Sequence, residues 1–461
     1  MTIALNQAAR ELIRPFQVED SQFLAARKRA FLGHKTGMGK TLIGLAAWSL
    51  WPNIRKTLIL GKKSSMAVWS TQPADWTNLE GRFVEDTSDW QEAVSSRDGT
   101  WMMTYEMYLR LTKGSVGKWK SEWDLVICDA AHKLRNRKTQ IVKALHRLEF
   151  DHFIGMSATW ASRGPQDLWA VLNLIAPAYF PSYWRFVETW CFVERTTFGT
   201  EVFGVRNLDN LKKLMSQYYR TRTWKEIGRQ FDPVERRMVK IRMTVEQRRL
   251  HDELTANMMA MVGDRLVVTG SVLALITRLR QVAVSPKLLS ATAGYGAGIE
   301  YLVDALEDDP HTVIFTPFTE AIPIIEQAFK DAGYEHILHL WGGMQPAKVN
   351  AIVAEWKRLK GIMLCSIGFA EAFAMDTTHT AYFLGFDWDP NQNIEAEGRL
   401  RRLDSELVEP CIVNYIFNQQ SIEDHVQEVV NNKVRTVSQV FQDMTYLMRG
   451  HGREVAATTS S

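Results

Sequence analysis

The sequence predicts an α/β fold with two doubly wound parallel sheets and a helical insertion between them. Short apolar runs recur without the alternation of polar and apolar residues that marks a half-exposed strand, so they suit parallel strands buried on both faces. Helical patterns, such as 41–50 and 346–359, lie between the runs, which is the order of a doubly wound fold. The expected strands are 56–61, 123–129, 152–159, 312–318, 361–366, 380–387 and 411–417.

The apolar runs fall into two groups, which predicts two sheet domains, at 1–225 and 291–450. The intervening segment 226–290 is rich in Arg, Met, Leu and Glu at helical spacing and lacks convincing strands, so we expect a helical insertion or bridge there. Small and Gly-rich residues at 289–298 predict a linker into the second sheet. The tail 451–461 is expected to be disordered.

Composition excludes several classes of protein. The chain has 461 residues, of which 46% are hydrophobic and 23% charged, as in globular proteins of two or three domains. The net charge of +3 gives no overall basic field, so any nucleic-acid surface must come from local patches. The four cysteines form no CxxC pair, which argues against structural zinc and disulfides. Without an apolar run of roughly 18 residues or a secretion signal, we expect a cytoplasmic protein with reduced thiols.

A glycine-rich turn, TGMGKT, opens the helix expected at 41–50. Glycines let the backbone wrap a phosphate with successive N–H groups pointing inward, and the helix N-terminus adds partial positive charge. In such a loop the lysine reaches the β- and γ-phosphates of ATP and the threonine ligates Mg²⁺. The standard pattern has a glycine where this chain has His34. The candidate nucleotide-binding residues are Thr36, Gly37, Met38, Gly39, Lys40 and Thr41.

The segment IRPFQ, about twenty residues before this loop, contains two further candidates for nucleotide binding, Arg14 and Gln17. A glutamine amide both donates and accepts hydrogen bonds, so Gln17 is suited to reading the edge of an adenine.

The expected strand 123–129 ends in Asp129, and Ala130 follows it. An acid at the carboxyl end of a strand that follows a phosphate loop is typical of a Walker B motif, in which Asp129 and Thr41 hold Mg²⁺. The next residue is normally the glutamate that deprotonates the attacking water, but this box reads DAAH in place of DEAH. Since losing a general base costs about 10²–10⁴-fold in rate, we expect ATP to be bound and poorly hydrolysed. Either the alanine is engineered to trap a bound state, which the other motifs favour, or the ATPase is naturally silent.

The chain resembles the Swi/Snf-type DNA translocases of superfamily two from LIRPFQ to QQSIEDHV. The resemblance is carried by TGMGKT, MMTYEMYLR at 102–110, IGMSATWASRGPQDLW at 154–169 and FDWDPNQNIEAEGRLRRLD at 386–404. It implies two RecA-like domains that use ATP and Mg²⁺. The last motif corresponds to W-N-P followed by Q-A-x-x-R-x-x-R in the family, which places its residues at Trp388, Asp389, Pro390, Glu395, Ala396, Arg399 and Arg402.

The resemblance implies that Arg399 and Arg402 act as arginine fingers on the γ-phosphate, and we expect them on one helix face because they are three residues apart. Departures from the family pattern are Glu395 for Gln, alanines for the two glycines of AFAMDT at 372–377, and an aspartate for the asparagine of that turn. The chain shows no chromodomain, bromodomain or zinc module, and this compactness resembles bacterial or bacteriophage members, so the expected compartment is a bacterial or phage-infected cell.

The expected function is ATP-driven translocation on double-stranded or branched DNA, in which ATP binding closes two lobes and hydrolysis opens them. Each lobe would grip DNA phosphates independently of sequence. Local basic patches lie at 133–138 and 219–229. The candidate DNA contacts are Lys62, Lys63, Thr104, Arg163, Thr316 and Ser366.

Three other functions stay open at this stage. They are an RNA or single-strand helicase of the DEAH type, the motor component of a restriction or defence complex, and a nucleotide-gated DNA-binding module without catalysis. Stimulation by duplex DNA or by RNA separates the first of these from a DNA translocase.

Overall fold

The computed structural model describes residues 3–113, 122–161, 163–196, 199–228, 234–262, 265–307, 309–342, 344, 346–369, 373–401, 405, 409–428, 430 and 455–456. Contacts between residues divide the chain into two compact units, the first built on residues 1–229 and the second on 230–432. Within the described residues, no helix is both long enough and apolar enough to cross a membrane.

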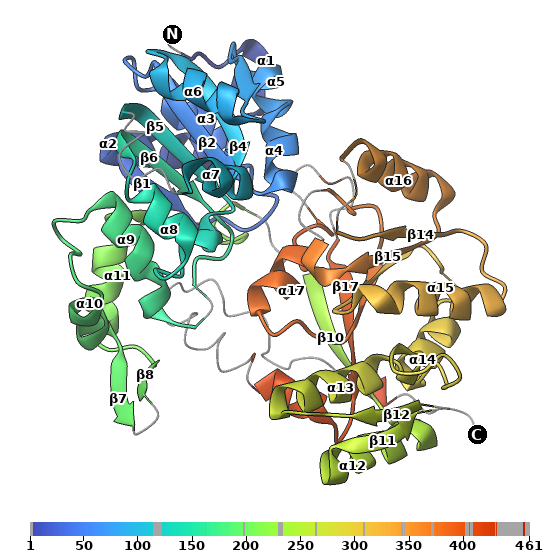
Figure 1. Ribbon diagram of the computed structural model, residues 1–461. Coiled ribbons are helices and arrows are strands. Elements are labelled where there is room, and N and C mark those ends of the chain that lie inside the picture. Colours follow the sequence, from blue (N-terminus) through green and yellow to red (C-terminus); the bar gives the residue numbers. More distant parts are fainter. Residues whose placement is uncertain are drawn as a thin grey trace. The chain divides into compact units, whose positions relative to one another are not determined.

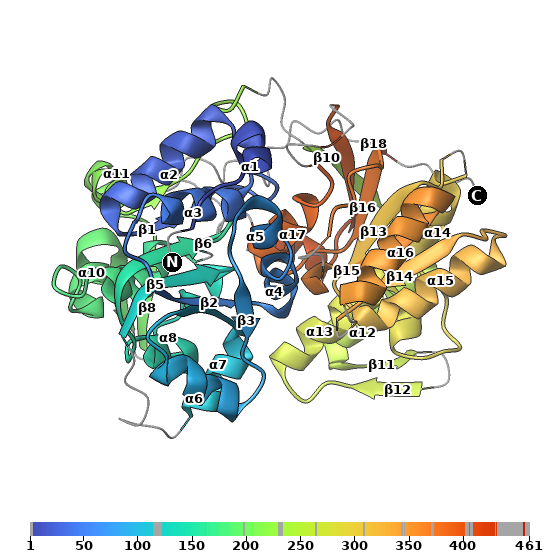
Figure 2. The same ribbon diagram turned by 90° about the horizontal axis from the view of Figure 1, so that it is seen from above.

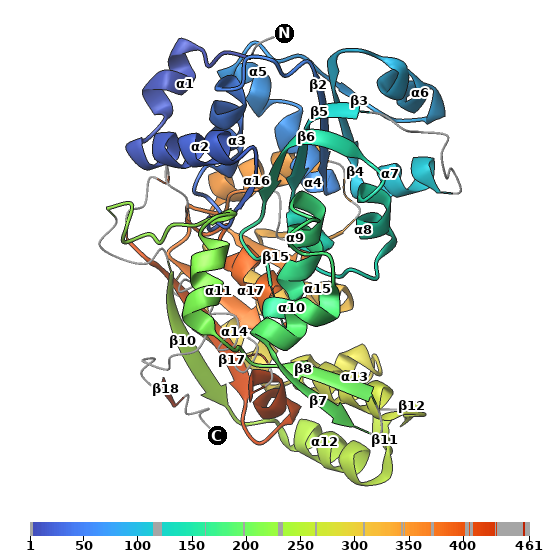
Figure 3. The same cartoon turned by 90° about the vertical axis from the view of Figure 1, so that its left-hand side faces the viewer.

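The first unit contains a parallel sheet, seven-stranded in its described part, with the order β3-β4-β2-β5-β6-β1-β9. Helices cover both of its faces, α2 and α3 on one and α6 to α9 on the other (Figures 1 and 3). The strands are β1 (Arg29–Leu32), β2 (Lys56–Gly61), β3 (Gly81–Phe83), β4 (Gly99–Thr104), β5 (Glu122–Asp129), β6 (Glu149–Met156) and β9 (Tyr219–Arg220), with a separate hairpin of β7 (Phe192–Thr196) and β8 (Gly199–Phe203).

The helices of the first unit bury their apolar faces on this sheet. Trp90, Tyr108, Ile141 and Leu172, from four different helices, share one buried cluster with Leu58 and other strand residues. The α-helices are α1 (Gln7–Leu12), α2 (Pro15–Arg27), α3 (Lys40–Ser49), α4 (Lys63–Trp69), α5 (Gln72–Trp76), α6 (Thr87–Ser95), α7 (Tyr105–Thr112), α8 (Gln140–Leu145), α9 (Trp169–Ile175), α10 (Tyr183–Trp190) and α11 (Leu208–Met215).

The second unit repeats this plan with a parallel sheet, seven-stranded where described, in the order β14-β15-β13-β16-β17-β10-β18. Helices α14 and α15 pack on one face and α17 lies on the other (Figure 2). The strands are β10 (Val234–Ile241), β13 (Thr312–Thr316), β14 (Ile337–Leu340), β15 (Ile362–Ser366), β16 (Thr380–Leu384), β17 (Cys411–Asn418) and β18 (Val455–Ala456). The α-helices are α12 (Val245–Asn257), α13 (Val272–Val284), α14 (Ala297–Ala305), α15 (Ile322–Asp331), α16 (Pro346–Leu359) and α17 (Pro390–Glu397).

The seven strands expected from apolar runs are all present, with ends that differ by a few residues. The segment 226–290 contains helices α12 and α13, as expected, but the expectation that it lacks strands is wrong. Strand β10 pairs in parallel with β17 over its whole length, and β11 (Met259–Val262) and β12 (Arg265–Val268) form a hairpin. Strand β10, with the sequence VERRMVKI, was not expected because charged residues are usually exposed. In the structure Arg236 pairs with Glu397, whose side chain is 2% exposed.

Two smaller expectations also change. The Gly-rich stretch 289–298 is no linker between sheets, because β10 has already joined the second sheet and α14 begins at Ala297. In the tail expected to be disordered, Val455 and Ala456 form β18 beside β10. An edge strand leaves a row of backbone groups unpaired, so even a short segment can add to it.

Candidate functional site

Strand register gathers the motifs of the first unit at one edge of its sheet. Gly61 pairs with Thr104, Asp129 with Met156, and Leu32 with Met156, so the carboxyl ends of five neighbouring strands are level. The phosphate loop follows β1 at this edge, and Asp129 ends β5 there. The carboxyl edge is where ligands bind in open α/β sheets.

The phosphate loop is a tight turn whose backbone angles favour glycine. Gly37 and Gly39 have φ angles of 85° and 73°, in the left-handed region. A Cβ atom on Gly39 would also lie 2.3 Å from Nε2 of Gln17. Lys40, the first residue of α3, donates from Nζ to the carbonyl oxygens of His34 and Lys35 at 2.7 and 3.1 Å. The ammonium group of Lys40 is therefore bound by the loop itself, and a phosphate would have to compete with these carbonyls for it.

Gln17 lies against this loop and is 3% exposed. Its Nε2 donates to the carbonyl of Met38 at 3.2 Å, and its Oε1 accepts from the backbone N–H of Arg14 at 2.9 Å. Both ends of the amide are thus engaged within the protein. A second N–H of Nε2 and a second lone pair of Oε1 remain for another partner, such as an adenine edge.

The carboxylate of Asp129 is held by two donors. Its Oδ1 accepts from the backbone N–H of Ala130 at 2.8 Å, and its Oδ2 accepts from Nε1 of Trp69 at 3.1 Å. The hydroxyl of Tyr105 donates to the Asp129 carbonyl at 2.8 Å. Ala130 has left-handed backbone angles, φ 53° and ψ 41°, so the chain turns sharply after the acid.

The SAT segment, residues 157–159, joins this edge through His132. Nδ1 of His132 lies 3.1 Å from Oγ of Ser157, and the Ser157 N–H donates to the Leu32 carbonyl at 3.1 Å. The Ser157 hydroxyl also donates to the Thr159 carbonyl at 3.1 Å. These bonds connect the end of β5 to the end of β1, where the phosphate loop begins.

The candidate DNA contacts lie in several settings. Lys62 and Lys63 begin α4 at the carboxyl edge, where Thr104 caps α7 by accepting from the Met107 N–H at 3.1 Å. The guanidinium of Arg163 is engaged, since its Nε donates to the buried carboxylate of Asp167 at 2.9 Å. In the second unit, the other two candidates end strands β13 and β15 and are buried: Thr316 at 0% and Ser366 at 7% exposed.

A buried ionic cluster behind the loop was not apparent from the sequence. Asp20 of α2 and His34 are both 0% exposed, and His34 Nε2 lies 2.8 Å from Asp20 Oδ2. Arg220 and Arg222 donate to the same carboxylate, from Nε at 2.7 and 2.9 Å. These arginines belong to the run 219–229, which charge alone suggested as a DNA patch. Their partner Asp20 lies 200 residues or more away in sequence, so the pairing becomes visible only in the folded structure.

The cluster lowers the pKa of both of its titrating members, for different reasons. Burial disfavours ionisation of Asp20, but the hydrogen bonds from His34, Arg222 and Arg220 outweigh it and hold the pKa of Asp20 well below its usual range. Burial lowers the pKa of His34 against the raising effect of Asp20, so a neutral imidazole suits the site. The phosphate loop thus starts from a residue tied to α2 and to the segment after β9.

The arginine motif of the second unit departs from expectation. Helix α17 ends at Glu397, with Gly398 as its C-cap, so Arg399 lies beyond the end of this helix. Glycine is a poor helix former, which explains the end. The carbonyl of Arg399 accepts from the Met375 N–H at 2.8 Å, which joins it to the turn at 373–377. Arg402 lies outside the described residues.

Two neighbours of this motif have structural partners that the sequence did not indicate. Asp376, which stands where the family has asparagine, accepts from Lys357 Nζ at 2.8 Å. Arg401 is 1% exposed and donates to the carbonyls of Thr378 and Glu409, both at 2.8 Å. Glu395, in the position of the family glutamine, is 7% exposed on α17.

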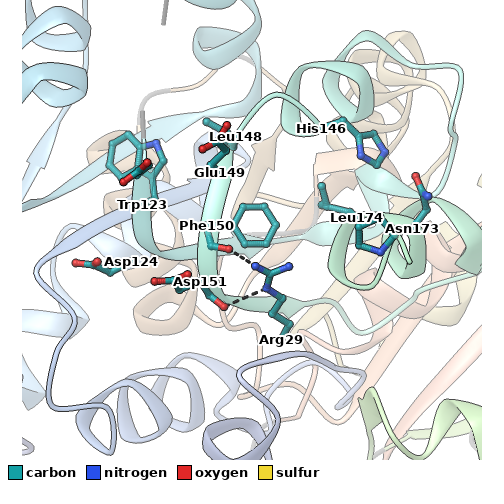
Figure 4. A pocket seen from close by; sticks show the side chains of 12 residues that line it. Arg29, Trp123, Asp124, His146, Leu148, Glu149, Phe150, Asp151, Asn173 and Leu174 are labelled. Atoms are coloured by element: carbon teal, nitrogen blue, oxygen red, sulfur yellow. Dashed lines mark hydrogen bonds between the residues drawn. The ribbon is translucent and has the colours of Figure 1, made fainter. Parts of the chain in front are cut away.

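A hollow of about 610 Å³ lies at the opposite edge of the first sheet, where β1, β5 and β6 begin (Figure 4). Arg29 donates from Nε to the Asp151 carbonyl at 3.0 Å, and its guanidinium lies 4.9 Å from the centre of the Phe150 ring. Since this edge is the amino end of the strands, the hollow is separate from the phosphate loop.

The Asp20 cluster gives a test by stability. Asp20→Asn should lower the free energy of unfolding at pH 7 by about 3–5 kcal/mol, because it removes the buried carboxylate that Arg220 and Arg222 share. The lowered pKa of Asp20 means that its contribution is present above the unfolded pKa near 4 and is lost as pH falls toward the folded pKa. Urea denaturation of the full chain at pH 7 and below pH 4 should therefore show a smaller loss in the acid samples.

The matched control is Glu92→Gln, which removes an ion pair with Arg82 whose side chains are 60% and 51% exposed. It should cost at most about 1 kcal/mol. Equal effects of the two substitutions at pH 7 would contradict the role given to Asp20.

Comparison with known proteins bears on the whole chain. The curated relatives include the protein CHROMATIN REMODELING 4 of Arabidopsis thaliana, 22% identical over 88% of this chain and 20% of its own length. A SWI/SNF-related matrix-associated actin-dependent regulator of chromatin subfamily A-like protein 1 of Xenopus laevis is 20% identical over 93% of this chain and 44% of its length. The chain thus spans 20% of the length of the first relative and 44% of the length of the second.

Among solved structures, the Sulfolobus solfataricus SWI2/SNF2 ATPase core in complex with dsDNA is 20% identical and covers 90% of both chains, with a TM-score of 0.44. The family model described as SNF2-related domain matches residues 16–288, which is more than half of the chain. This range contains the phosphate loop, Asp129 and the SAT segment. The chain belongs to the SNF2-related domain family.

Proposed function

We propose that the chain is an ATP-driven motor that translocates on double-stranded or branched DNA. The observation that supports this most directly is the level carboxyl edge of the first sheet, which brings the phosphate loop and Asp129 together in a chain of the SNF2-related family. Relatives named as chromatin-remodelling factors, and an ATPase core solved with duplex DNA, agree with DNA as the partner.

The residues at this edge fit a nucleoside triphosphate with a divalent cation. The loop from Thr36 to Gly39 packs closely against Gln17 at its last glycine, and its left-handed glycines suit a backbone that wraps a phosphate. The hydroxyl of Thr41 and the carboxylate of Asp129 are oxygen donors of the kind that Mg²⁺ prefers. Lys40 would exchange its two carbonyl acceptors for phosphate oxygens. Mg²⁺, when bound, would neutralise charge that develops on the β- and γ-oxygens.

Hydrolysis requires a proton acceptor that position 130 lacks. The left-handed turn at Ala130 follows the carboxylate immediately, so a side chain there starts from the carboxyl edge of the sheet. A glutamate at this position would serve as the general base, and an alanine cannot. We therefore propose that this chain retains nucleotide and turns it over slowly. Arg399 and Arg402 of the second unit would stabilise charge on the transferred phosphoryl group.

Movement would follow from alternate binding and release of the triphosphate. Lys62, Lys63 and Thr104 lie at the same edge as Asp129, so contact with a DNA backbone there would be close to the nucleotide. Backbone contacts carry no sequence information, and binding should be independent of sequence.

Ala130→Glu tests the motor directly. The substitution should raise ATP hydrolysis about 10²–10⁴-fold in the presence of duplex DNA, because it supplies the missing base. Phosphate release with duplex DNA, single-stranded DNA or RNA as the stimulant is the measurement. Ala130→Gln is the control, since it adds equal volume without a base. In the Ala130→Glu background, Lys40→Ala should abolish nucleotide binding. Stimulation by RNA alone, or no gain at all, would contradict the proposal.

Arg402→Ala, in the Ala130→Glu background, should reduce hydrolysis by about 10³–10⁵-fold while nucleotide affinity stays unchanged, because an arginine finger acts on the transition state. Titration with a fluorescent ATP analogue and phosphate release separate the two effects. The control is Arg237→Ala, since Arg237 is half-exposed and pairs with exposed Glu235. Equal loss of affinity and of rate in the Arg402 variant would exclude a finger role.

Affinity for DNA should fall steeply with salt. A protein that neutralises several phosphates releases their counterions, and the logarithm of affinity declines linearly with the logarithm of salt concentration, at about −0.9 per phosphate contact. Fluorescence anisotropy with two unrelated duplexes should give the same slope for both. A flat plot, or different slopes for the two sequences, would argue against backbone binding.

A further inference from the structure

Trp69 is the last residue of α4 and is 1% exposed. Its Nε1 donates to Oδ2 of Asp129 at 3.1 Å. The carboxylate is the one that the proposed function assigns to Mg²⁺. A completely buried aromatic side chain thus contacts a candidate metal ligand directly, although 60 residues separate them in sequence.

The end of β2 makes this approach possible. A Cβ on Gly61 would lie 2.7 Å from Cε of Met66 and 3.6 Å from Cβ of Asp129. The absence of a side chain at Gly61 therefore lets α4 pack close to the end of β5. Because Trp69 is packed in the core, its N–H has a fixed direction.

A buried tryptophan of this unit does not need a hydrogen-bond acceptor for its indole N–H. The Nε1 atoms of Trp90, Trp101 and Trp123 are buried and lack a hydrogen-bond partner in the structure. Those of Trp51 and Trp160 donate to backbone carbonyls, at 3.0 and 2.7 Å. Packing in this core therefore does not require a carboxylate acceptor, and the contact of Trp69 with one calls for another explanation.

The two donors to Asp129 fix the plane of its carboxylate. Oδ1 accepts from Ala130 N–H and Oδ2 from Trp69, and each oxygen keeps a further lone pair for another partner. Carboxylates that bind metals are commonly oriented in this way, and loss of the orienting group typically reduces metal affinity about 10–100-fold.

We propose that Trp69 is a positioning residue that orients the Asp129 carboxylate toward the divalent cation of the bound nucleotide. The proposal rests on the proposed function, since it takes Asp129 as the metal ligand. In this proposal Trp69 does not itself bind the nucleotide or the metal. It acts through Asp129 alone.

The test compares Trp69→Phe with Trp90→Phe in the full chain. Both replace a side chain that is 1% exposed in the same unit, but only the first removes a described hydrogen bond, because Trp90 Nε1 has no partner. Mn²⁺, which is paramagnetic, is titrated in the presence of ADP and followed by electron paramagnetic resonance. Trp69→Phe should raise the Mn²⁺ concentration at half-saturation about tenfold or more, and Trp90→Phe should leave it unchanged.

A second comparison separates positioning from a general loss of packing. ADP affinity without a divalent cation should be the same in both variants, since the phosphate loop is unchanged. In an Asp129→Asn background, Trp69→Phe should have little further effect on Mn²⁺ binding, because the two residues act as one unit. An equal effect in both backgrounds, or equal Mn²⁺ binding by the two tryptophan variants, would overturn the proposal.

Failure of the proposed function would look different. In that case the unsubstituted chain and Trp90→Phe would also bind no Mn²⁺ with ADP, and the role of Trp69 would fall with it. If Trp69→Phe does not fold, thermal melting will show this, and Asp129→Asn in the otherwise unchanged chain then decides. Normal Mn²⁺ binding by Asp129→Asn would overturn the proposal, and loss of that binding would support the ligand role on which it depends.

Discussion

The parallel register of the first sheet is the constraint on which the site depends. Because β1, β2, β4, β5 and β6 end level, segments that are far apart in sequence meet at one edge. The phosphate loop follows one strand, Asp129 ends another, and the SAT segment follows a third. A shift of one residue in β5 would place Asp129 away from the loop and turn its neighbours to the other face of the sheet.

Buried polar contacts hold the start of the phosphate loop at that edge. Asp20 holds His34 at the start of the phosphate loop together with Arg220 and Arg222, and desolvation makes such a cluster costly unless each charge is paired. Gln17 supports the loop from α2 in a similar way. The loop is therefore preorganised by residues that do not themselves carry phosphate-binding chemistry. A phosphate that enters would replace the contacts of Lys40 with the carbonyls of His34 and Lys35.

Packing at the same edge also fixes the orientation of the Asp129 carboxylate. A carboxylate at the end of a strand is free to rotate unless donors fix it, and Trp69 and Ala130 provide those donors from two sides. The position that follows adopts a left-handed turn, which fixes where a base would stand. Under the proposed function, an alanine in place of the base would leave the cation-binding geometry unchanged. Binding and hydrolysis would then be separable, because different residues would carry them.

The sequence by itself determined the parts of the molecule that are local. Apolar runs, the glycine turn and the acid at the end of a run identified the strands, the phosphate loop and Asp129, because each depends on a few adjacent residues. It failed at β10, where the partner of Arg236 is Glu397, and it did not indicate that Arg220 and Arg222 pair with Asp20. It also placed Arg399 on a helix that ends two residues earlier. Only the tertiary structure decided these points, since charged residues look exposed until the fold supplies their buried partners. The role of Trp69 is of the same kind, because a hydrogen bond between distant residues exists only after two strands have been set side by side.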